Sequence, residues 1–178
     1  MKKRNKYLLL ISGIIILALI PVSIYVNFFY EPRFPIYRLV YVVDADTFII
    51  DMDGKEERVR LLYVNTPESY HPGRKKNTVE GLVVYALVKN MLQPGTKVVL
   101  EKEEGRDDRD RYRSLLRYMF VPGKITGGET DYINFNVWLV KNGYSPYYVE
   151  HGRSKKYDKE FREAAEFFKN NKVELKRK

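Results

Sequence analysis

The chain has 178 residues, of which 44% are hydrophobic, and this length and composition allow one packed domain with a short appendage. It contains no cysteine, which excludes disulfide bonds, thiolate metal sites and lipid-modified cysteines. The net charge is +9, and four positive charges lie in the first six residues, so the remainder of the chain carries +5. A mildly basic remainder suits a polyanionic partner or an anionic membrane surface, and by itself selects neither.

An uncharged stretch follows this basic cluster. No charged residue occurs between Tyr7 and Tyr30, and a bilayer core needs roughly 20 apolar residues in a helix. We therefore expect residues 1–6 to be a cytoplasmic flank, residues 7–29 a transmembrane signal-anchor and residues 30–35 a spacer. Secretion after signal cleavage is the alternative, although no small-x-small site follows the apolar run. Both interpretations place the rest of the chain outside the cytoplasm, either on a membrane crossed once or released.

Patterns of strands and helices follow in chain order. Alternating and β-branched residues predict strands, and Asp53-Gly54 is a hairpin turn signal. From Val79 the apolar residues change to a helical period, and we expect Val79, Leu82 and Val83 to lie on the buried face. The charged run between the last two strands is interpreted as a solvated loop. The predicted strands are Ile36–Val43, Thr47–Met52, Glu56–Val64, Thr96–Glu101 and Leu115–Val121, and the predicted helices are Val79–Leu92, Val137–Asn142 and Lys155–Asn170.

These elements predict an α+β fold, in which a five-stranded OB-type β-barrel carries three α-helices after one N-terminal transmembrane helix. The folded domain is expected to span residues 36–171, and residues 172–178 form a basic tail. Asn136 is interpreted as the N-cap of the second helix, and Gly143 as its end. Tyr148, near that end, is a candidate for stacking on a nucleotide base, with packing against the core as the alternative.

Polar residues gather in two segments at strand ends. Asp44 and Asp46 stand between the first two strands, where an extended chain would point both to one side. Arg60, Asn65, Thr66 and Glu68 follow at the end of the third strand. Hydrolysis of a phosphodiester needs oxygen ligands for a hard cation, a guanidinium for the phosphate and a carboxylate that orients or deprotonates water. The second segment and Asp46 supply all three. The two histidines, His71 and His151, have no zinc-ligand spacing.

The motifs Asp44-Ala45-Asp46-Thr47, Arg60-Leu61-Leu62-Tyr63-Val64-Asn65-Thr66-Pro67-Glu68 and Asp110-Arg111-Tyr112 resemble the staphylococcal nuclease family. The similarity extends from about Ile36 to Asn171 and includes the segment Asn136–Tyr144. The resemblance implies a five-stranded OB-type barrel with three helices. It also implies cleavage of DNA and RNA with calcium, leaving 3′-phosphates.

The resemblance implies a role for each matching residue. Asp46, Asn65 and the carbonyl of Thr66 would bind Ca²⁺. Arg60 would hold the phosphate, and Glu68 would position or activate the attacking water. The residues expected to border the nucleic acid are Lys75, Lys76, Arg111 and Tyr112.

Two positions depart from the family pattern. Asn65 stands where the family often has Asp, and calcium affinity falls with the charge of the ligands, so we expect weaker binding. The family typically reads Asp-x-Tyr-Gly-Arg where this chain reads Asp110-Arg111-Tyr112-Arg113-Ser114, so Ser114 replaces a catalytic arginine. Either the turn shifts by one residue and Arg113 becomes catalytic, or the arginine is lost and activity is weak. Loss of the glycine argues against an unchanged turn.

Three functions therefore remain open. The first is a calcium-dependent nuclease that acts on DNA or RNA outside the cell membrane. The second is a weakened module of the same fold that binds nucleic acid or protein without turnover. The third is a membrane-tethered protein scaffold. The soluble domain is expected to be monomeric.

Overall fold

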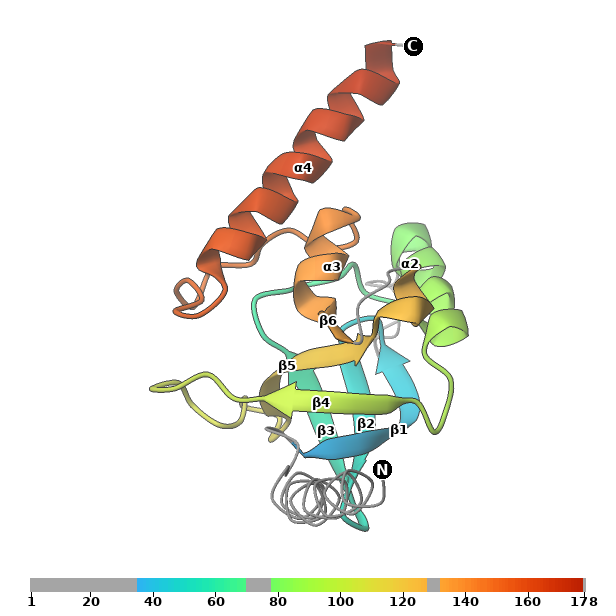
Figure 1. Cartoon of the computed structure of the whole chain (residues 1–178), viewed down its shortest axis with the longest axis vertical. Coiled ribbons are helices and arrows are strands. Elements are labelled where there is room, and N and C mark those ends of the chain that lie inside the picture. The colour runs from blue at the N-terminus through green and yellow to red at the C-terminus, as the bar shows by residue number, and fades with distance from the viewer. Residues whose placement is uncertain (1–34, 70–77, 128–131, 178) are drawn as a thin grey trace, which may run out of the picture. The chain divides into compact units, whose positions relative to one another are not determined.

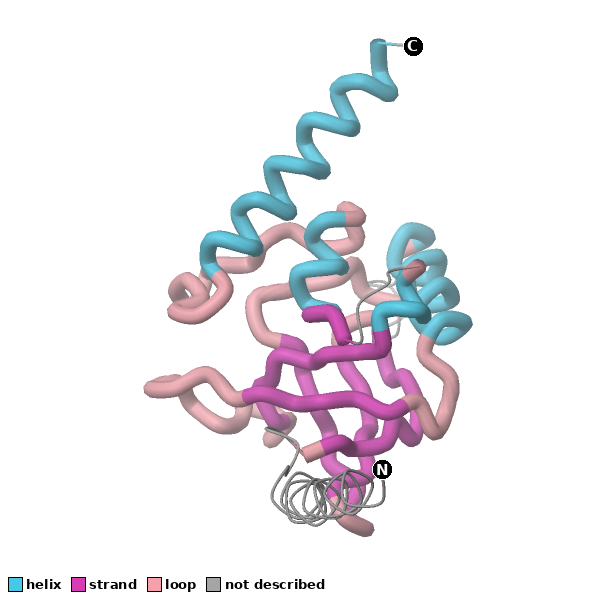
Figure 2. The backbone as a smooth tube through the Cα atoms, viewed as in Figure 1, coloured by secondary structure: helices cyan, strands magenta, loops and turns pink. Residues whose placement is uncertain are grey.

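The computed structural model of the chain describes residues 35–69, 78–127 and 132–177. Strands β1 (Ile36–Asp44), β2 (Thr47–Met52) and β3 (Lys55–Leu61) form an antiparallel meander. Strand β4 (Lys97–Glu101) pairs with β1, and β5 (Leu115–Pro122) pairs with β4 and, in parallel, with β3. These pairings close a five-stranded barrel (Figures 1 and 2), which confirms the predicted OB-type architecture.

Three α-helices lie outside the barrel within the described residues. Helix α2 (Val79–Met91) contacts β1, α3 (Phe135–Lys141) contacts β5, and α4 (Asp158–Arg177) packs against α3. Figure 2 shows α2 and α3 toward the same end of the barrel. After β5 the chain forms the short helix η2 (Gly123–Thr126) and, before α3, the strand β6 (Tyr132–Asn134), which pairs with β5.

The alternation of side chains along β3 separates the core from the outer face of the barrel. Val59 and Leu61 are buried, whereas Arg58 is exposed and Arg60 is half-buried. Phe48 of β2 and Phe135 of α3 meet edge to face in the same core, with ring centroids 6.3 Å apart. The outer face of β3 therefore presents two guanidinium groups on a strand that the core holds in place.

Helix α2 buries a different face from the one predicted. Gly81, Val84 and Val88 are buried, whereas Val79 is 75% exposed and Leu82 and Val83 are also exposed. The physical reason is Gly81, since its missing side chain lets the helix lie directly against the backbone of the segment after β3. Helical periodicity alone cannot reveal that a glycine marks the contact face.

Other element boundaries also differ from the predictions. Strand β3 ends at Leu61, α4 begins at Asp158, and α4 continues to Arg177. The N-cap of α3 is Asn134, whose side chain accepts a hydrogen bond from the Val137 amide.

Two polar side chains, Asn136 and Glu103, are buried. Asn136 donates its side-chain amide to the Leu62 carbonyl and accepts from the Met119 amide, so it joins three segments. Glu103, within the charged run predicted to be solvated, is only 4% exposed.

No helix among residues 35–69, 78–127 and 132–177 has the length and apolar character needed to cross a membrane. The transmembrane helix predicted for residues 7–29 lies outside these ranges, as do Lys75, Lys76 and His71.

Candidate active site

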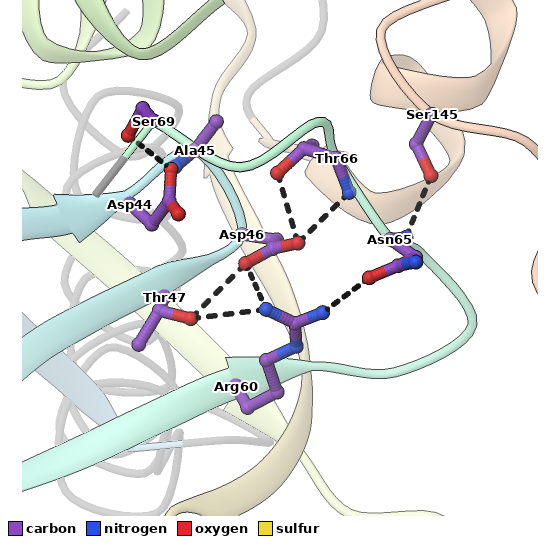
Figure 3. Close-up of polar contacts among 9 residues, drawn as sticks. All are labelled: Asp44, Ala45, Asp46, Thr47, Arg60, Asn65, Thr66, Ser69 and Ser145. Carbon is purple, nitrogen blue, oxygen red and sulfur yellow. Dashed lines mark hydrogen bonds and ion pairs between the residues drawn. The ribbon is translucent and has the colours of Figure 1, made fainter. Parts of the chain in front are cut away.

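Asp46 lies at the centre of a polar cluster where β1 turns into β2 (Figure 3). Its side chain is 1% exposed, and one carboxylate oxygen accepts hydrogen bonds from the amide and the hydroxyl of Thr66, both at 2.9 Å. The other oxygen accepts from the Thr47 hydroxyl at 3.0 Å and forms an ion pair with Arg60. Thr47 at the start of β2, Arg60 of β3 and Thr66 after β3 therefore fix this carboxylate.

Asp44 does not belong to this cluster. Its carboxylate accepts from its neighbour's amide, that of Ala45, at 2.8 Å, and from the Ser69 hydroxyl at 2.6 Å (Figure 3). The prediction that Asp44 and Asp46 face one side assumed an extended chain, whereas Ala45 and Asp46 form the turn between the two strands. Asp44 instead ties this turn to the segment that carries Glu68.

Arg60 joins the two side chains that were predicted to bind a metal. Its pairing with Thr47 across β2 and β3 sets its position. One terminal nitrogen contacts Asp46 and, at 3.3 Å, the Thr47 hydroxyl, and the other donates to the Asn65 side-chain oxygen at 2.9 Å. The Arg60 side chain is 28% exposed, so the guanidinium is oriented by the protein and still reachable from solvent.

The charge of Asp46 depends on its cationic surroundings. Burial raises the pKa of this carboxyl group above its usual value, and the charge of Arg60 and the hydrogen bonds from Thr66 oppose that rise only in part. A buried carboxylate without a cation is costly, because the charged form loses its hydration. The environment of Asp46 therefore favours a nearby positive charge, whether a guanidinium or a metal ion.

The segment after β3 carries Asn65, Thr66 and Glu68 along an open cleft of about 510 Å³. Asn65 is exposed, and its backbone amide donates to the Ser145 hydroxyl at 2.8 Å. Thr66 is buried and Glu68 is exposed. The cleft is bordered by this segment, by the start of α2 and by the residues after α3, namely Asn65, Thr66, Pro67, Glu68, Thr78, Gly143, Tyr144, Ser145 and Pro146.

Helix α2 fixes the backbone at Glu68. The Glu68 carbonyl accepts from the amide of Thr78 at 2.9 Å, and the Thr78 hydroxyl caps the helix by accepting from the Gly81 amide, also at 2.9 Å. A Cβ atom added at Gly81 would meet the Glu68 carbonyl oxygen at 2.2 Å. The carboxylate that was predicted to handle water therefore stands on a backbone held by a helix N-terminus.

The donor set suits a hard cation. The Asp46 carboxylate and the Asn65 amide oxygen both converge on the Arg60 guanidinium, and oxygen ligands of these kinds bind Ca²⁺. No group of three or more acidic, histidine or cysteine side chains with metal-site geometry occurs in the part of the chain that the structure describes.

The turn before β5 keeps a glycine-like conformation at Arg113, which has φ +68°. The Arg113 amide donates to the Asp110 carbonyl at 2.9 Å, and the Asp110 carboxylate accepts from the amides of Tyr112 and Ser114. Asp110 therefore holds a tight hydrogen-bonded turn in which Arg113 has a conformation that glycine adopts without strain.

The structure does not bring Arg113 into the cluster. Its side chain is exposed, and no hydrogen bond or ion pair among the described residues joins it to Asp46, Arg60 or Glu68. Ser114, at the position where arginine was expected, is 2% exposed.

The remaining candidates lie apart from the cluster or outside the described ranges. The Arg111 guanidinium lies 4.8 Å from the centre of the Tyr112 ring, and Tyr112 is 71% exposed. Tyr148 donates its backbone amide to the Tyr63 carbonyl, and its ring meets His151 edge to face. Lys75 and Lys76 belong to residues that the structure does not describe.

Sequence reasoning missed the residues that support the cluster from a distance. The Ser145 hydroxyl accepts a hydrogen bond from the backbone amide of Asn65. The two residues are 80 positions apart in the sequence, so no local pattern points to this contact. Thr47 stood inside a recognised motif, and its hydroxyl bonds to both Asp46 and Arg60. That motif was the one signal that could have identified Thr47 as part of the site.

Comparisons with known proteins agree with this geometry. The family described as "Staphylococcal nuclease homologue" matches residues 58–176, more than half of the chain. The thermonuclease of Staphylococcus intermedius is 34% identical over 107 residues, which cover 60% of this chain and 56% of that protein. The thermonuclease of Staphylococcus hyicus is 31% identical over the same extent. Endonuclease YncB of Bacillus subtilis is 37% identical over 83 residues, covering 46% of this chain and 37% of that protein. The chain thus spans about half the length of the thermonucleases it matches.

Proposed function

We propose that this chain, which belongs to the staphylococcal nuclease family, is a calcium-dependent nuclease that hydrolyses phosphodiester bonds of DNA or RNA. The observation that carries the proposal is the bonded cluster of Asp46, Arg60, Asn65 and Thr66 beside a cleft that Glu68 also borders. The relatives named as thermonucleases and as an endonuclease support the same chemistry.

Arg60 is the residue best placed to bind the phosphate. Its guanidinium is held from one side by Asp46 and Asn65 and is partly open to solvent on the other. Such a fixed cation stabilises the negative charge that develops on the phosphate oxygens, because it needs no reorganisation when the charge appears. Asp46 and Thr47 act as positioning residues that hold this group beside Asn65, which borders the cleft.

Glu68 is the residue that orients or deprotonates the attacking water. Its exposure in the cleft leaves room for water beside the carboxylate, and the backbone contact with α2 fixes where that carboxylate stands. A positioned general base contributes about 10²–10⁴-fold to a rate.

Asp46, Asn65 and the Thr66 carbonyl would hold the calcium ion. When bound, Ca²⁺ supplies positive charge to the phosphate oxygens beside Arg60. Since Asp46 is the one carboxylate of the three ligands, we expect weak affinity that depends on the charge of this residue.

A catalytically weakened nucleic-acid-binding module is the second candidate. The observation that favours it is the turn before β5, where Arg113 forms no hydrogen bond or ion pair with the cluster among the described residues and Ser114 carries no charge. A module of this kind would bind nucleic acid with strong salt dependence and without turnover.

We further propose that residues 7–29 anchor the chain in a cell membrane and display the domain outside the cytoplasm. The support is the uncharged run from Tyr7 to Tyr30 with basic residues before it. Protease treatment of intact cells should then digest the domain from a protein that fractionates with membranes. Recovery of a shortened, soluble protein from the medium would favour the cleaved alternative.

The nuclease proposal is tested with the full-length chain in detergent and a labelled single-stranded DNA oligonucleotide, with calcium or with a chelator. Glu68→Gln should lower calcium-dependent cleavage by about 10²–10⁴-fold. Glu166→Gln, which removes an exposed carboxylate on α4, is the matched control and should cleave as the unmodified chain does. Calcium-dependent cleavage that survives in Glu68→Gln would overturn the assigned role. No calcium-dependent cleavage by the unmodified chain would overturn the nuclease proposal, and salt-sensitive binding would then identify the second candidate.

A further inference from the structure

Arg58 lies on the same face of β3 as Arg60. The two residues are separated by Val59, which is buried in the barrel, so the alternation of the strand turns both guanidinium side chains outward. Pairing with β2 places Arg58 opposite Ile49 and Arg60 opposite Thr47, so Arg58 lies two residues farther along the strand from the turn at Asp46. Positions two apart on a strand have Cα atoms about 6.6–6.8 Å apart, within reach of one extended substrate.

The parallel pairing of β3 and β5 brings Ser114 next to Arg58. The register matches Val59 with Leu115 and Arg60 with Leu116, and one step back along both strands aligns Arg58 with Ser114. Neighbouring strands are about 4.8 Å apart. Ser114 has a short, uncharged side chain and is buried, so position 114 itself supplies no positive charge beside Arg58.

Arg58 is also free to bind an anion. Its side chain is exposed, and within the described ranges it has no hydrogen bond or ion pair. The carboxylate of the next residue, Glu57, already forms ion pairs with Lys55 and, at 2.9 Å, with Arg109. The hydrogen bond from Arg109 is the main reason that the pKa of Glu57 is lowered to about 2. Within the described residues, Arg58 therefore contributes a positive charge that forms no ion pair on the outer face of β3, where Glu56 is the neighbouring exposed carboxylate.

The cluster needs such a charge. Three of the five donors of Arg60 are already used, since its terminal nitrogens bond to Asp46, Thr47 and Asn65. Phosphoryl transfer relies on several positive groups around the equatorial oxygens, and each is worth orders of magnitude in rate. Besides the proposed calcium ion, a partly engaged Arg60 leaves room for a second guanidinium at the phosphate.

We infer that Arg58 is the second phosphate-binding guanidinium of this site, taking on from β3 the role that an arginine at position 114 would have had from the adjoining strand β5. The inference rests on the proposed function, because it assigns Arg58 to the same substrate. It places the two guanidinium groups on one strand, two residues apart, with the small, uncharged Ser114 at the matching position of β5.

A double-mutant cycle on the full-length chain tests whether a guanidinium at position 58 does what one at position 114 would do. Arg58→Ala should lower calcium-dependent cleavage of single-stranded DNA by about 10²-fold. In the Arg58→Ala background, Ser114→Arg should raise the cleavage rate at least tenfold. In the unmodified chain, the same substitution should change the cleavage rate much less. Arg38→Ala is the matched control, because Arg38 is exposed on β1, opposite Asp51, farther from the cluster. It should leave cleavage unchanged.

Binding to the same oligonucleotide, measured by fluorescence anisotropy in EDTA, separates this inference from the nuclease proposal. Arg58→Ala should weaken binding and lower the salt-dependence slope by about 0.7, the value for one phosphate contact on a single strand. If the unmodified chain does not cleave, the nuclease proposal fails, and a selective loss of binding in Arg58→Ala still supports the phosphate contact. If Arg58→Ala matches Arg38→Ala in both cleavage and binding, with equal melting temperatures, the inference is overturned.

Discussion

Arg113 occupies a backbone conformation that ordinary residues avoid. Its φ of +68° lies in the left-handed region, which costs a non-glycine residue roughly 1–2 kcal/mol. The hydrogen bonds of Asp110 to the turn hold it there. The turn therefore retains the shape that glycine would adopt without strain, although the sequence has lost the glycine.

Arg113→Gly should consequently stabilise the protein. Relief of the left-handed strain exceeds the added flexibility of the unfolded chain, so we expect the free energy of unfolding to rise by about 0.5–1 kcal/mol. Denaturant unfolding of the two proteins measures the difference. Arg111→Gly is the control, because Arg111 has no positive φ and should gain nothing. A lower free energy of unfolding for Arg113→Gly would show that the arginine side chain, rather than the backbone, determines the stability of this turn.

The sequence identified the residues of the cluster whose roles depend on local motifs. Asp46, Arg60, Asn65 and Thr66 were predicted together, and the structure bonds them to one another. The motif also contained the information that position 113 needs a glycine-like conformation. It could not reveal that Arg58 lies beside Ser114, because that depends on the parallel register of two strands more than fifty residues apart.

Helix α2 shows how one glycine decides the orientation of an element. Its apolar residues recur at helical spacing on two faces, and the buried face is the one that contains Gly81. There the helix touches the backbone of Pro67 and Glu68, and any side chain at position 81 would collide with it. Hydrophobicity predicted that the helix exists, and close backbone packing determined how it is rotated.

Gly81→Ala should therefore destabilise the protein, although alanine is the better helix former. An exposed helix position would gain roughly 0.5–1 kcal/mol from this change, whereas overpacking at position 81 should cost about 1–3 kcal/mol. Since the collision is with the Glu68 backbone, kcat for cleavage should also fall. Ala86→Gly, at an exposed position of the same helix, is the control and should lose about 1 kcal/mol without a change in kcat. Equal kcat values for Gly81→Ala and the unmodified protein would contradict the proposed support of Glu68.

At the scale of the whole molecule, the segment between α3 and α4 is held to the barrel by tyrosines and buried carboxylates. The Tyr63 hydroxyl donates to Glu103, which also accepts from the Lys155 amide at 2.5 Å. Tyr147 stacks on Phe161 and donates to Asp158 at 2.9 Å. None of these contacts is local, which is why a run rich in charge was interpreted as solvated loop. The meander of β1–β3 was predictable from short patterns, but this long-range network was not.

Because of these tyrosines, we expect the folded protein to lose stability at alkaline pH. Burial, the largest cause, and the hydrogen bond to Glu103 raise the pKa of Tyr63 to about 12, and burial likewise raises the pKa of Tyr147 to about 12. An unfolded tyrosine ionises near pH 10, so between pH 10 and 12 the unfolded chain has released protons that the folded chain still holds. Raising the pH through this window therefore favours unfolding, and the stabilisation present below pH 10 is lost by about pH 12.

Tyr63→Phe should make this loss shallower. The variant removes one of the groups that hold a proton in the folded state, so its free energy of unfolding should fall less steeply between pH 10 and 12. It should also be less stable near neutral pH, because Glu103 stays buried without its phenol donor. Urea unfolding at several pH values measures both effects, and Tyr112→Phe, which removes an exposed hydroxyl, serves as the comparison. If the free energies of unfolding of Tyr63→Phe and the unmodified protein fell equally steeply with pH, ionisation of Tyr63 would not cause the alkaline loss of stability, and other groups of the network would.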